Sequence, residues 1–377
     1  MYSIGKDCSV KARIGWQGLT TSEYLQTGHY GLITSTDLIE GKVNWDTCVF
    51  VSEERYKQDT NIIVKNGDVL VSKDGTIGKV AVVSNLQYPT TLNSGVFVIR
   101  TKNEKITQEG LGLVFISPYF KDFIKRLTAG STIVHLYQKD IVNFTFPIPT
   151  LPEQHRIASA LTSIDNLISS LGKLIEKKKN IKQGTMQQLL TGQIRLKGFS
   201  EPWGEKKLEE VCSVKRGVRV VKRNLTTDGL YPVYQNTNFP LGYSNQYNVE
   251  ANTPFVIIGG SAGQVGICRE RYWAADDCAF FACHDIYKEY LYYVLLLNQS
   301  NILHNVRTGT IPRLDRSFLS NMVVYISSNI DEQQAIATIL TKMDDEITAL
   351  EAKRAKYEAI KQGMMQQLLT GKIRLIS

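Results

Sequence analysis

The chain carries Gln187-Gln188-Leu189-Leu190-Thr191-Gly192-Gln193-Ile194-Arg195-Leu196 and repeats it, with a single change, as Gln366-Gln367-Leu368-Leu369-Thr370-Gly371-Lys372-Ile373-Arg374-Leu375. Upstream of each copy, at the same offset, Glu153-Gln154 recurs as Glu332-Gln333. A match at one constant spacing indicates duplication of a structural element. The 377-residue chain therefore contains two copies of one long segment.

Each copy has the apolar spacing of a helix that buries one seam against another helix. Apolar residues alternate four and three apart at Ile157, Leu161, Ile164, Ile168, Leu171 and Ile175, and again at Ile336, Leu340, Met343, Ile347 and Leu350. Pro152 stands where the first helix begins, and Gly192 and Gly371 stand where a helix stop is expected. The interior glycines, Gly184 and Gly363, indicate either close approach by a neighbouring backbone or a tolerated weak point.

The regions before the two helices are rich in strand-like runs and Gly or Asn turns, and they resemble each other in order. Ile4–Lys11 matches Leu208–Lys215, Gly75 and Gly78 match Gly263 and Gly266, and Leu136 matches Leu314. We expect an α/β fold of mixed α+β type, with domains at 1–150 and 197–330 and helical spacers at 151–196 and 331–377. Antiparallel pairing of the helices would give a pseudo-twofold repeat.

Composition narrows the class of protein. The 44 Lys and Arg exceed the 36 Asp and Glu, which favours a polyanionic partner without identifying one. Charges near Met1 and the short apolar runs argue against a signal peptide or a membrane span, so we expect a cytoplasmic protein without a membrane partner. The six cysteines lack paired Cys-x-x-Cys spacing, and we expect free thiols rather than a zinc site at Cys283-His284.

Two similar domains on a rigid spacer suit a partner with two separated features, and duplex DNA offers them. Arg and Lys contact phosphates or guanine, and Asn and Gln match adenine. In the second domain the candidate DNA-binding residues are Lys215, Arg216, Arg219, Lys222, Arg223, Gln235, Asn236, Asn238, Arg307 and Arg313. In the first they are Lys11, Arg13, Thr20, Thr21, Lys73 and His135. Because the two sets differ, we expect an asymmetric target.

These features resemble the specificity subunits of type I restriction-modification systems. The resemblance covers nearly the whole chain and depends on the duplication and on several short motifs in order. These are Pro152-Glu153-Gln154, Lys182-Gln183-Gly184 leading to Gly192, Lys197-Gly198-Phe199 before Trp203, and Tyr231-Pro232-Val233-Tyr234 before Gly242-Tyr243.

The resemblance implies two target-recognition domains that read the halves of a bipartite site, with the helices setting the spacing. It also implies two modification (methyltransferase) subunits and restriction/translocase subunits as partners. S-adenosylmethionine, ATP and magnesium are then expected on those partners, and no cofactor on this chain. The positions that we expect to dock partners, or else to pack the helices together, are Met186, Gln187, Gln188, Met365, Gln366 and Gln367.

Catalytic signatures are weak in this sequence. Gly259–Gly266 lacks the Lys-Ser/Thr of a phosphate-binding loop and indicates tight turns. Ser117-Pro118-Tyr119-Phe120 lacks the second Pro of an adenine-methylating loop and indicates a helix start. Asp344, Asp345, Glu351 and Lys353 could serve a metal-dependent nuclease, but solvated helix flanks are the simpler interpretation. The alternatives to a non-catalytic DNA-recognition subunit are a coiled-coil protein-interaction scaffold and a truncated or rearranged specificity subunit.

Overall fold

The computed structural model describes residues 1–129, 135–221, 223 and 225–375. The chain forms two compact units, which are described separately. Unit 1 comprises Met1–Ser170 with Arg354–Ser377, and unit 2 comprises Leu171–Lys353. The unit boundaries fall inside the two long helices, α6 (Leu151–Leu190) and α11 (Ile330–Leu368), so each unit contains part of both.

The helix parts in each unit run antiparallel, as their paired residues show. In unit 1, Lys361 Nζ lies 2.6 Å from Asp165, and Ile157 and Leu161 form a buried cluster with Met365 and Leu368. In unit 2, Lys182 Nζ lies 2.5 Å from Asp344. This is the equivalent pair, with the lysine now on α6 and the aspartate on α11. The predicted seam is confirmed, since Ile164, Leu171, Ile175, Ile336, Leu340 and Ile347 are also buried.

The ends of the long helices agree with the sequence pattern. Gly192 and Gly371 follow α6 and α11 at φ +70° and +69°, a left-handed conformation that glycine adopts without strain. A Cβ at Gly184 or Gly363 would meet no atom within 4 Å in the described part of the chain. Within this chain the two interior glycines are therefore a tolerated weak point rather than a site of close packing.

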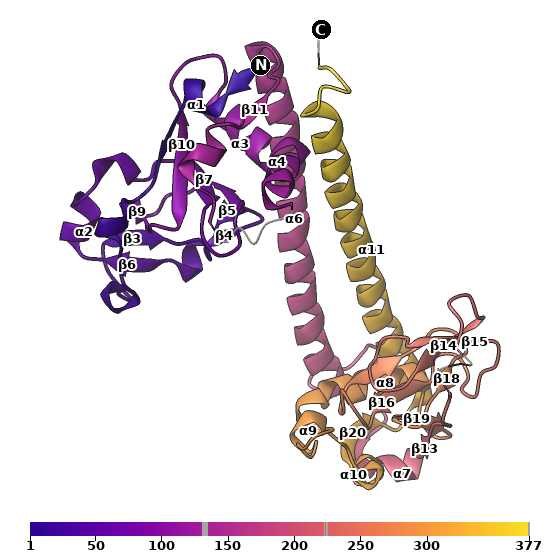
Figure 1. The fold of residues 1–377 in the computed structure, drawn as a ribbon. Helices are drawn as coiled ribbons and strands as arrows, with labels where there is room; N and C mark the ends of the chain where they lie inside the picture. The colour runs from indigo at the N-terminus through magenta and orange to yellow at the C-terminus, as the bar shows by residue number, and fades with distance from the viewer. Residues whose placement is uncertain (130–134, 222, 224, 376–377) are drawn as a thin grey trace. The chain divides into compact units, whose positions relative to one another are not determined.

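The first domain lies in unit 1, and Figure 1 labels most of its elements. Its strands are β1 (Tyr2–Ser3), β2 (Cys8–Lys11), β3 (Tyr30–Ile33), β4 (Leu38–Ile39), β5 (Gly41–Val43), β6 (Val49–Val51), β7 (Val69–Ser72), β8 (Val80–Val82), β9 (Thr90–Leu92), β10 (Val96–Thr101) and β11 (Thr145–Phe146). Its helices are α1 (Ile4–Asp7), α2 (Glu53–Lys57), α3 (Gln108–Ile116), α4 (Pro118–Thr128) and α5 (Gln138–Ile141), with short 3-10 turns at Gly15–Gln17, Thr21–Glu23, Trp45–Thr47 and Thr60–Ile62.

The second domain lies in unit 2. Its strands are β12 (Trp203–Lys207), β13 (Cys212–Arg216), β14 (Tyr231–Tyr234), β15 (Gly242–Ser244), β16 (Pro254–Ile257), β17 (Val265–Ile267), β18 (Trp273–Ala274), β19 (Cys278–Cys283) and β20 (Val323–Ser327). Its helices are α7 (Leu208–Val211), α8 (Lys288–Leu297), α9 (Gln299–His304) and α10 (Arg316–Asn321).

The two domains share one topology. The strand order β2-β10-β7-β8 corresponds to β13-β19-β16-β17, β6-β3-β9 to β15-β14-β18, and β1-β11 to β12-β20. The first domain adds β5 and β4 at the edge of its main sheet. In both domains a short helix and a strand, α1–β2 and α7–β13, follow the first strand at the positions matched by sequence, Ile4–Lys11 and Leu208–Lys215.

The predicted match between the glycine loops of the two domains is wrong, because it is shifted by three residues in the second domain. Gly78 N–H donates to Ser72 O, and the equivalent bond in unit 2 comes from Gly263 to Ile257. Gly75 and Gly78 therefore correspond to Gly260 and Gly263, and all four have positive φ. The predicted tight turns are confirmed, as is the helix start at Pro118, where the Ser117 hydroxyl accepts the Tyr119 N–H. No helix in the described residues is long and apolar enough to cross a membrane.

The repeated Glu-Gln pair anchors each long helix. In unit 1, the Arg374 guanidinium donates to both Glu153 carboxylate oxygens, at 2.8 and 2.6 Å. The Gln154 side-chain oxygen accepts the Thr107 N–H at 3.0 Å, at the start of α3. Glu153 is 1% exposed, and the bonds from Arg374 hold the pKa of its carboxyl below the usual value.

Unit 2 repeats this arrangement with the helices exchanged. Arg195 donates to both oxygens of Glu332, at 2.6 and 2.9 Å, and Gln333 accepts the Tyr287 N–H at the start of α8. The Trp203 indole also donates to Glu332 at 2.9 Å. The Glu-Gln and Ile-Arg-Leu motifs of the repeat thus close the same contact in each unit.

Candidate nucleic-acid interface

In unit 2, loops at one end of the sheet β13-β19-β16-β17 form a polar edge, the unit 2 loop edge (residues 216–219, 235–239, 258–264, 275–277 and 307–313). Main-chain bonds hold it together. Ile258 N–H donates to Asp277 O at 2.8 Å, and Leu314 N–H donates to Ile258 O at 3.0 Å. Ser261 N–H donates to Asn236 O at 2.9 Å, which attaches the segment after β14.

Arg216 enters this edge from the end of β13. Its Nε donates to the Asp276 carbonyl at 2.7 Å, which uses one of the five N–H donors of the guanidinium. The next residue must be glycine, because a Cβ on Gly217 would lie 2.1 Å from the Ala275 carbonyl oxygen. Gly217 thus lets the chain turn close to the β18–β19 loop and places Arg216 and the exposed Arg219 at the edge.

Arg307 and Arg313 enter the edge together, since their main chains exchange N–H···O bonds of 2.8 and 3.1 Å. Arg313 also forms an isolated β-bridge with Gly259, and its guanidinium lies 3.5 Å from the Asp277 carboxylate. A Cβ on Gly259 would lie 2.4 Å from that carboxylate. Glycine at 259 therefore makes room for the Asp277 side chain.

The other predicted residues of this domain fall into three groups. Asn236, Asn238 and the half-buried Gln235 belong to the edge, and Asn238 N–H lies 3.4 Å from the Gln264 side-chain oxygen. Lys215 and Arg223 are exposed and lie outside the edge. Lys222 lies outside the described residues. The structure thus brings Arg216, Arg307, Arg313, Asn236 and Asn238 together.

Unit 1 has an equivalent edge, the unit 1 loop edge (residues 11–12, 73–78, 93–95 and 135–137). Lys73 N–H donates to Gly95 O at 2.9 Å and Leu136 N–H donates to Lys73 O at 2.8 Å, the same bonds that unit 2 makes. His135 Nδ1 lies 2.5 Å from Asp74 Oδ1. Lys73 also lies over the Phe97 ring, with Nζ 5.4 Å from its centroid.

The prediction that Arg13 contacts DNA is wrong for this structure. Arg13 is 1% exposed, and its guanidinium donates to the Leu92 carbonyl at 2.9 Å and to the Thr91 hydroxyl and Gln58 side chain at 3.1 Å each. Burial, with the nearby Arg55, lowers the pKa of Arg13. A buried arginine whose donors are satisfied internally serves the fold.

The remaining candidates of the first domain are exposed. Lys11 ends β2 at the position equivalent to Lys215. Thr20 caps the short helical turn Thr21–Glu23, whose Glu23 caps Thr20 in return, with the Thr20 N–H 2.9 Å from the carboxylate. The Glu23 carboxylate also pairs with Arg55, and these bonds lower its pKa.

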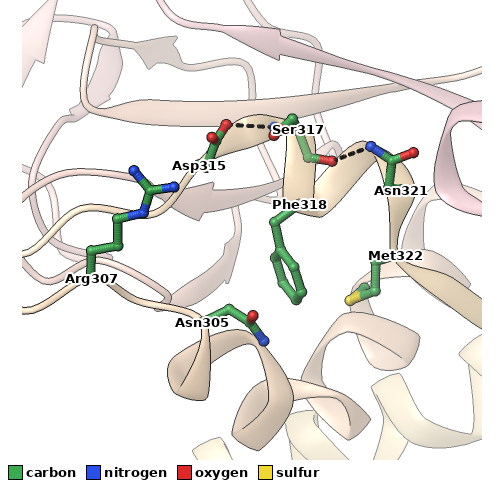
Figure 2. Close-up of a pocket in the computed structure, with 7 residues that line it drawn as sticks. All are labelled: Asn305, Arg307, Asp315, Ser317, Phe318, Asn321 and Met322. Carbon is green, nitrogen blue, oxygen red and sulfur yellow. Dashed lines mark hydrogen bonds between the residues drawn. The ribbon is translucent and has the colours of Figure 1, made fainter.

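A pocket of about 320 Å³ lies beside the unit 2 loop edge, and Arg307 lines it (Figure 2). Its polar groups hold helix α10: Asp315 accepts the Ser317 N–H and Asn321 donates to the Ser317 carbonyl, both at 2.9 Å. The bond from Ser317 lowers the pKa of Asp315. The Phe318 ring occupies the middle of the view, with Asn305 and Met322 around it. No nucleophile and base converge among these lining residues.

The three carboxylates of α11 that the sequence suggested for a nuclease, Asp344, Asp345 and Glu351, are paired with cations rather than gathered in a cluster. Asp344 binds Lys182 and the Tyr293 hydroxyl, Asp345 lies 2.9 Å from Arg269, and Glu351 lies 2.7 Å from Lys179. Among the described residues no group of three His, Cys, Asp or Glu side chains could hold a metal ion.

The six cysteines are free thiols. Burial raises the pKa of the Cys8 thiol to about 11 and of the Cys48 and Cys212 thiols to about 12. These three thiols are therefore neutral near pH 7 and are poor nucleophiles.

The helix positions predicted to dock partners divide into two kinds. Met186 is 3% exposed and packs in the core of unit 2, and Met365 is 7% exposed and packs between the helices of unit 1. For these two, the packing alternative is correct and the docking prediction is wrong. Gln187, Gln188 and Gln366 are exposed and Gln367 is half-buried, so they stay candidates.

Comparison with known proteins identifies the family. A model of the type I restriction modification DNA specificity domain matches residues 18–183 and 200–362. The chain belongs to this family. It is 26% identical over 362 residues to the type I restriction enzyme MjaVIII specificity subunit of Methanocaldococcus jannaschii, covering 83% of this chain and 81% of that one.

Solved structures of type I specificity subunits share the fold. The crystal structure of the type I restriction-modification system S subunit from M. genitalium aligns with a TM-score of 0.69 at 16% identity, over 98% of this chain and 95% of that chain. A chain from a structure on complex assembly and conformational transition of the type I R-M system aligns at 0.56, also at 16% identity, over 99% and 100%.

Sequence reasoning missed two acidic residues at the loop edges of this specificity-family protein. Asp74 and Asp277 pair with His135 and Arg313 across 61 and 36 residues of sequence. Neither carboxylate stands in a motif, and only the strand pairing brings each one to its cation. A correct alignment of the two glycine loops would have matched Asp74 of the first domain with Gly259 of the second. That alignment is the one signal in the sequence that could have revealed these carboxylates.

Proposed function

We propose that this chain is the DNA-recognition subunit of a type I restriction-modification complex and reads a bipartite, asymmetric site. One observation carries the proposal: two domains of one topology present different polar side chains at equivalent loop edges. The unit 2 loop edge has Arg216, Arg307 and Arg313, whereas the unit 1 loop edge has Lys11, Lys73 and His135. Since a shared scaffold with different contact residues reads different bases, the two half-sites differ.

The same proposal assigns the chemistry to partners. Two modification subunits would bring S-adenosylmethionine for adenine methylation, and restriction/translocase subunits would bring ATP and magnesium. This chain would supply no catalytic group and bind no cofactor. The long helices would set the spacing of the half-sites and dock the modification subunits, with Gln187, Gln188, Gln366 and Gln367 as contact candidates. Membership of the family supports this assignment.

The test uses the chain copurified with its neighbouring modification subunit. Arg216→Ala with Arg219→Ala removes two cations from the unit 2 loop edge, and Lys206→Ala with Lys207→Ala removes two from β12, before the start of β13. Fluorescence anisotropy on a duplex that the wild-type complex methylates would measure affinity over a salt series. We expect the arginine variant to bind about 10- to 100-fold more weakly with a shallower salt dependence, because each lost phosphate contact lowers the slope by about one.

The lysine variant should bind as the wild type does. Equal affinity for wild type and arginine variant would contradict the assignment of this edge. If the wild-type subunits assemble but the complex neither methylates nor binds duplex DNA, a protein-interaction scaffold replaces the proposed function.

A further inference from the structure

The two loop edges can be aligned position by position from their main-chain bonds. Lys73 corresponds to Ile258, because each accepts an N–H from an equivalent leucine and donates to an equivalent carbonyl. It follows that Asp74 corresponds to Gly259 and Gly95 to Asp277. The bridge Asp74–His135 then corresponds to the bridge Gly259–Arg313.

This alignment reveals an exchange between the domains. Each domain has one carboxylate and one glycine at these two positions, but in opposite order: Asp74 with Gly95 in unit 1, and Gly259 with Asp277 in unit 2. In both domains the carboxylate lies next to the side chain of the second residue of the bridge, which is His135 in unit 1 and Arg313 in unit 2. The distance is 2.5 Å from His135 Nδ1 and 3.5 Å from an Arg313 nitrogen.

Neither pair is placed to stabilise the fold. The His135 and Asp74 side chains are 55% and 37% exposed, and those of Arg313 and Asp277 are 59% and 24% exposed. Exposed ion pairs add little to stability because water screens them. Both pairs nevertheless occur at one equivalent point of a duplicated fold, at the edge where the predicted DNA contacts gather. An orienting role accounts for both facts.

We propose that His135 and Arg313 are equivalent base-reading residues, and that Asp74 and Asp277 are positioning residues that orient them. This inference rests on the proposed function. Arg313 offers only donors, which suits the O6 and N7 acceptors of guanine. The Asp74 carboxylate can only accept, so it selects the tautomer with the proton on His135 Nδ1, in which Nε2 is an acceptor that suits the amino group of adenine or cytosine. At this equivalent position, the second domain thus presents a donor to the base and the first domain presents an acceptor.

The test is the methylated motif of cells that express the complex, mapped by long-read sequencing, for a set of matched variants. His135→Arg should shift one position of the unit 1 half-site toward guanine and leave the other half-site unchanged. Arg313→His should do the converse. His29→Arg is the control, because His29 is an exposed histidine of the same domain and comes just before β3. The unit 1 loop edge contacts the opposite end of β3, where Asn93 N–H donates to Ile33 O.

The carboxylates are tested by removal and rescue. Asp74→Gly should relax selectivity at the same position by about 10-fold or more, with the melting temperature of the chain unchanged. Adding Gly95→Asp recreates the order found in unit 2 and should restore selectivity. The new Cβ would meet no atom closer than 3.5 Å, so the substitution fits.

The outcomes separate this inference from the proposed function. A wild-type complex that methylates no defined motif contradicts the function itself. A bipartite wild-type motif that His135→Arg and Arg313→His leave unchanged overturns the inference alone. A fall in melting temperature for Asp74→Gly, with the motif intact, would show that the pair is structural and would also overturn it.

Discussion

Arg13 and Lys11 are two residues apart, yet only Lys11 faces solvent. In a continuous strand, residues two apart point to the same face, so the sequence predicts that both side chains face solvent. A pattern of only four residues does not show where the strand ends. β2 ends at Lys11, and the chain then turns Arg13 inward against β9. The burial of a charged residue depends on acceptors far along the chain, Gln58 and Thr91, and no local pattern reveals them.

Arg13→Ala should therefore destabilise the protein more than Lys11→Ala does. Removing a buried guanidinium leaves its acceptors unpaired and should lower the free energy of unfolding by about 2–4 kcal/mol, against less than about 0.5 kcal/mol for the exposed lysine. Urea unfolding followed by circular dichroism measures both. A stable Arg13→Ala variant that has lost DNA affinity would reverse our assignment of this residue.

Among the elements, the long helices were the most predictable, because their apolar period extends over many turns. The glycine loops were the least, since Gly260, Gly263 and Gly266 offer two Gly-x-x-Gly matches of equal spacing. Backbone conformation decides between them, because Gly260 and Gly263 have positive φ as Gly75 and Gly78 do. Gly266 instead lies within β17 and faces the ring of Phe255 in β16. The misplaced register hid the equivalence of the two loop edges.

The anchor between Glu153 and Arg374 makes the attachment of α11 in unit 1 sensitive to acid. Arg374 lowers the pKa of the folded Glu153 carboxyl below its unfolded value of about 4.3, so its contribution is complete above that value and is lost as the pH falls through the folded pKa. Wild-type protein should lose thermal stability between about pH 5 and pH 3 more steeply than Glu153→Gln, in calorimetry at a series of pH values.

Glu358→Gln is the matched control, because Glu358 pairs with Arg354 on the exposed face of α11. It should follow the wild-type curve. A Glu153→Gln variant with the same pH profile as wild type would show that the anchor contributes no pH-dependent stability.

For the whole molecule, the duplication was visible in the sequence, and it led to the family and from there to the proposed function. What the sequence could not provide was the composition of the loop edges, because each edge gathers segments that are far apart in the chain, such as Lys11 with His135 and Arg216 with Arg313. Charge alone also misled, since it counted a buried arginine as a DNA contact and missed two carboxylates that orient their neighbours.

In the proposed function, this chain directs methylation to a site with two different halves. The most direct measurement is to coexpress it with its neighbouring modification subunit and map methylated adenines across the genome by long-read sequencing. We expect one bipartite motif with unlike halves at a fixed spacing, absent when either subunit is omitted. A stably assembled complex with S-adenosylmethionine present that methylates no defined motif, or one symmetric motif, would contradict the proposed function.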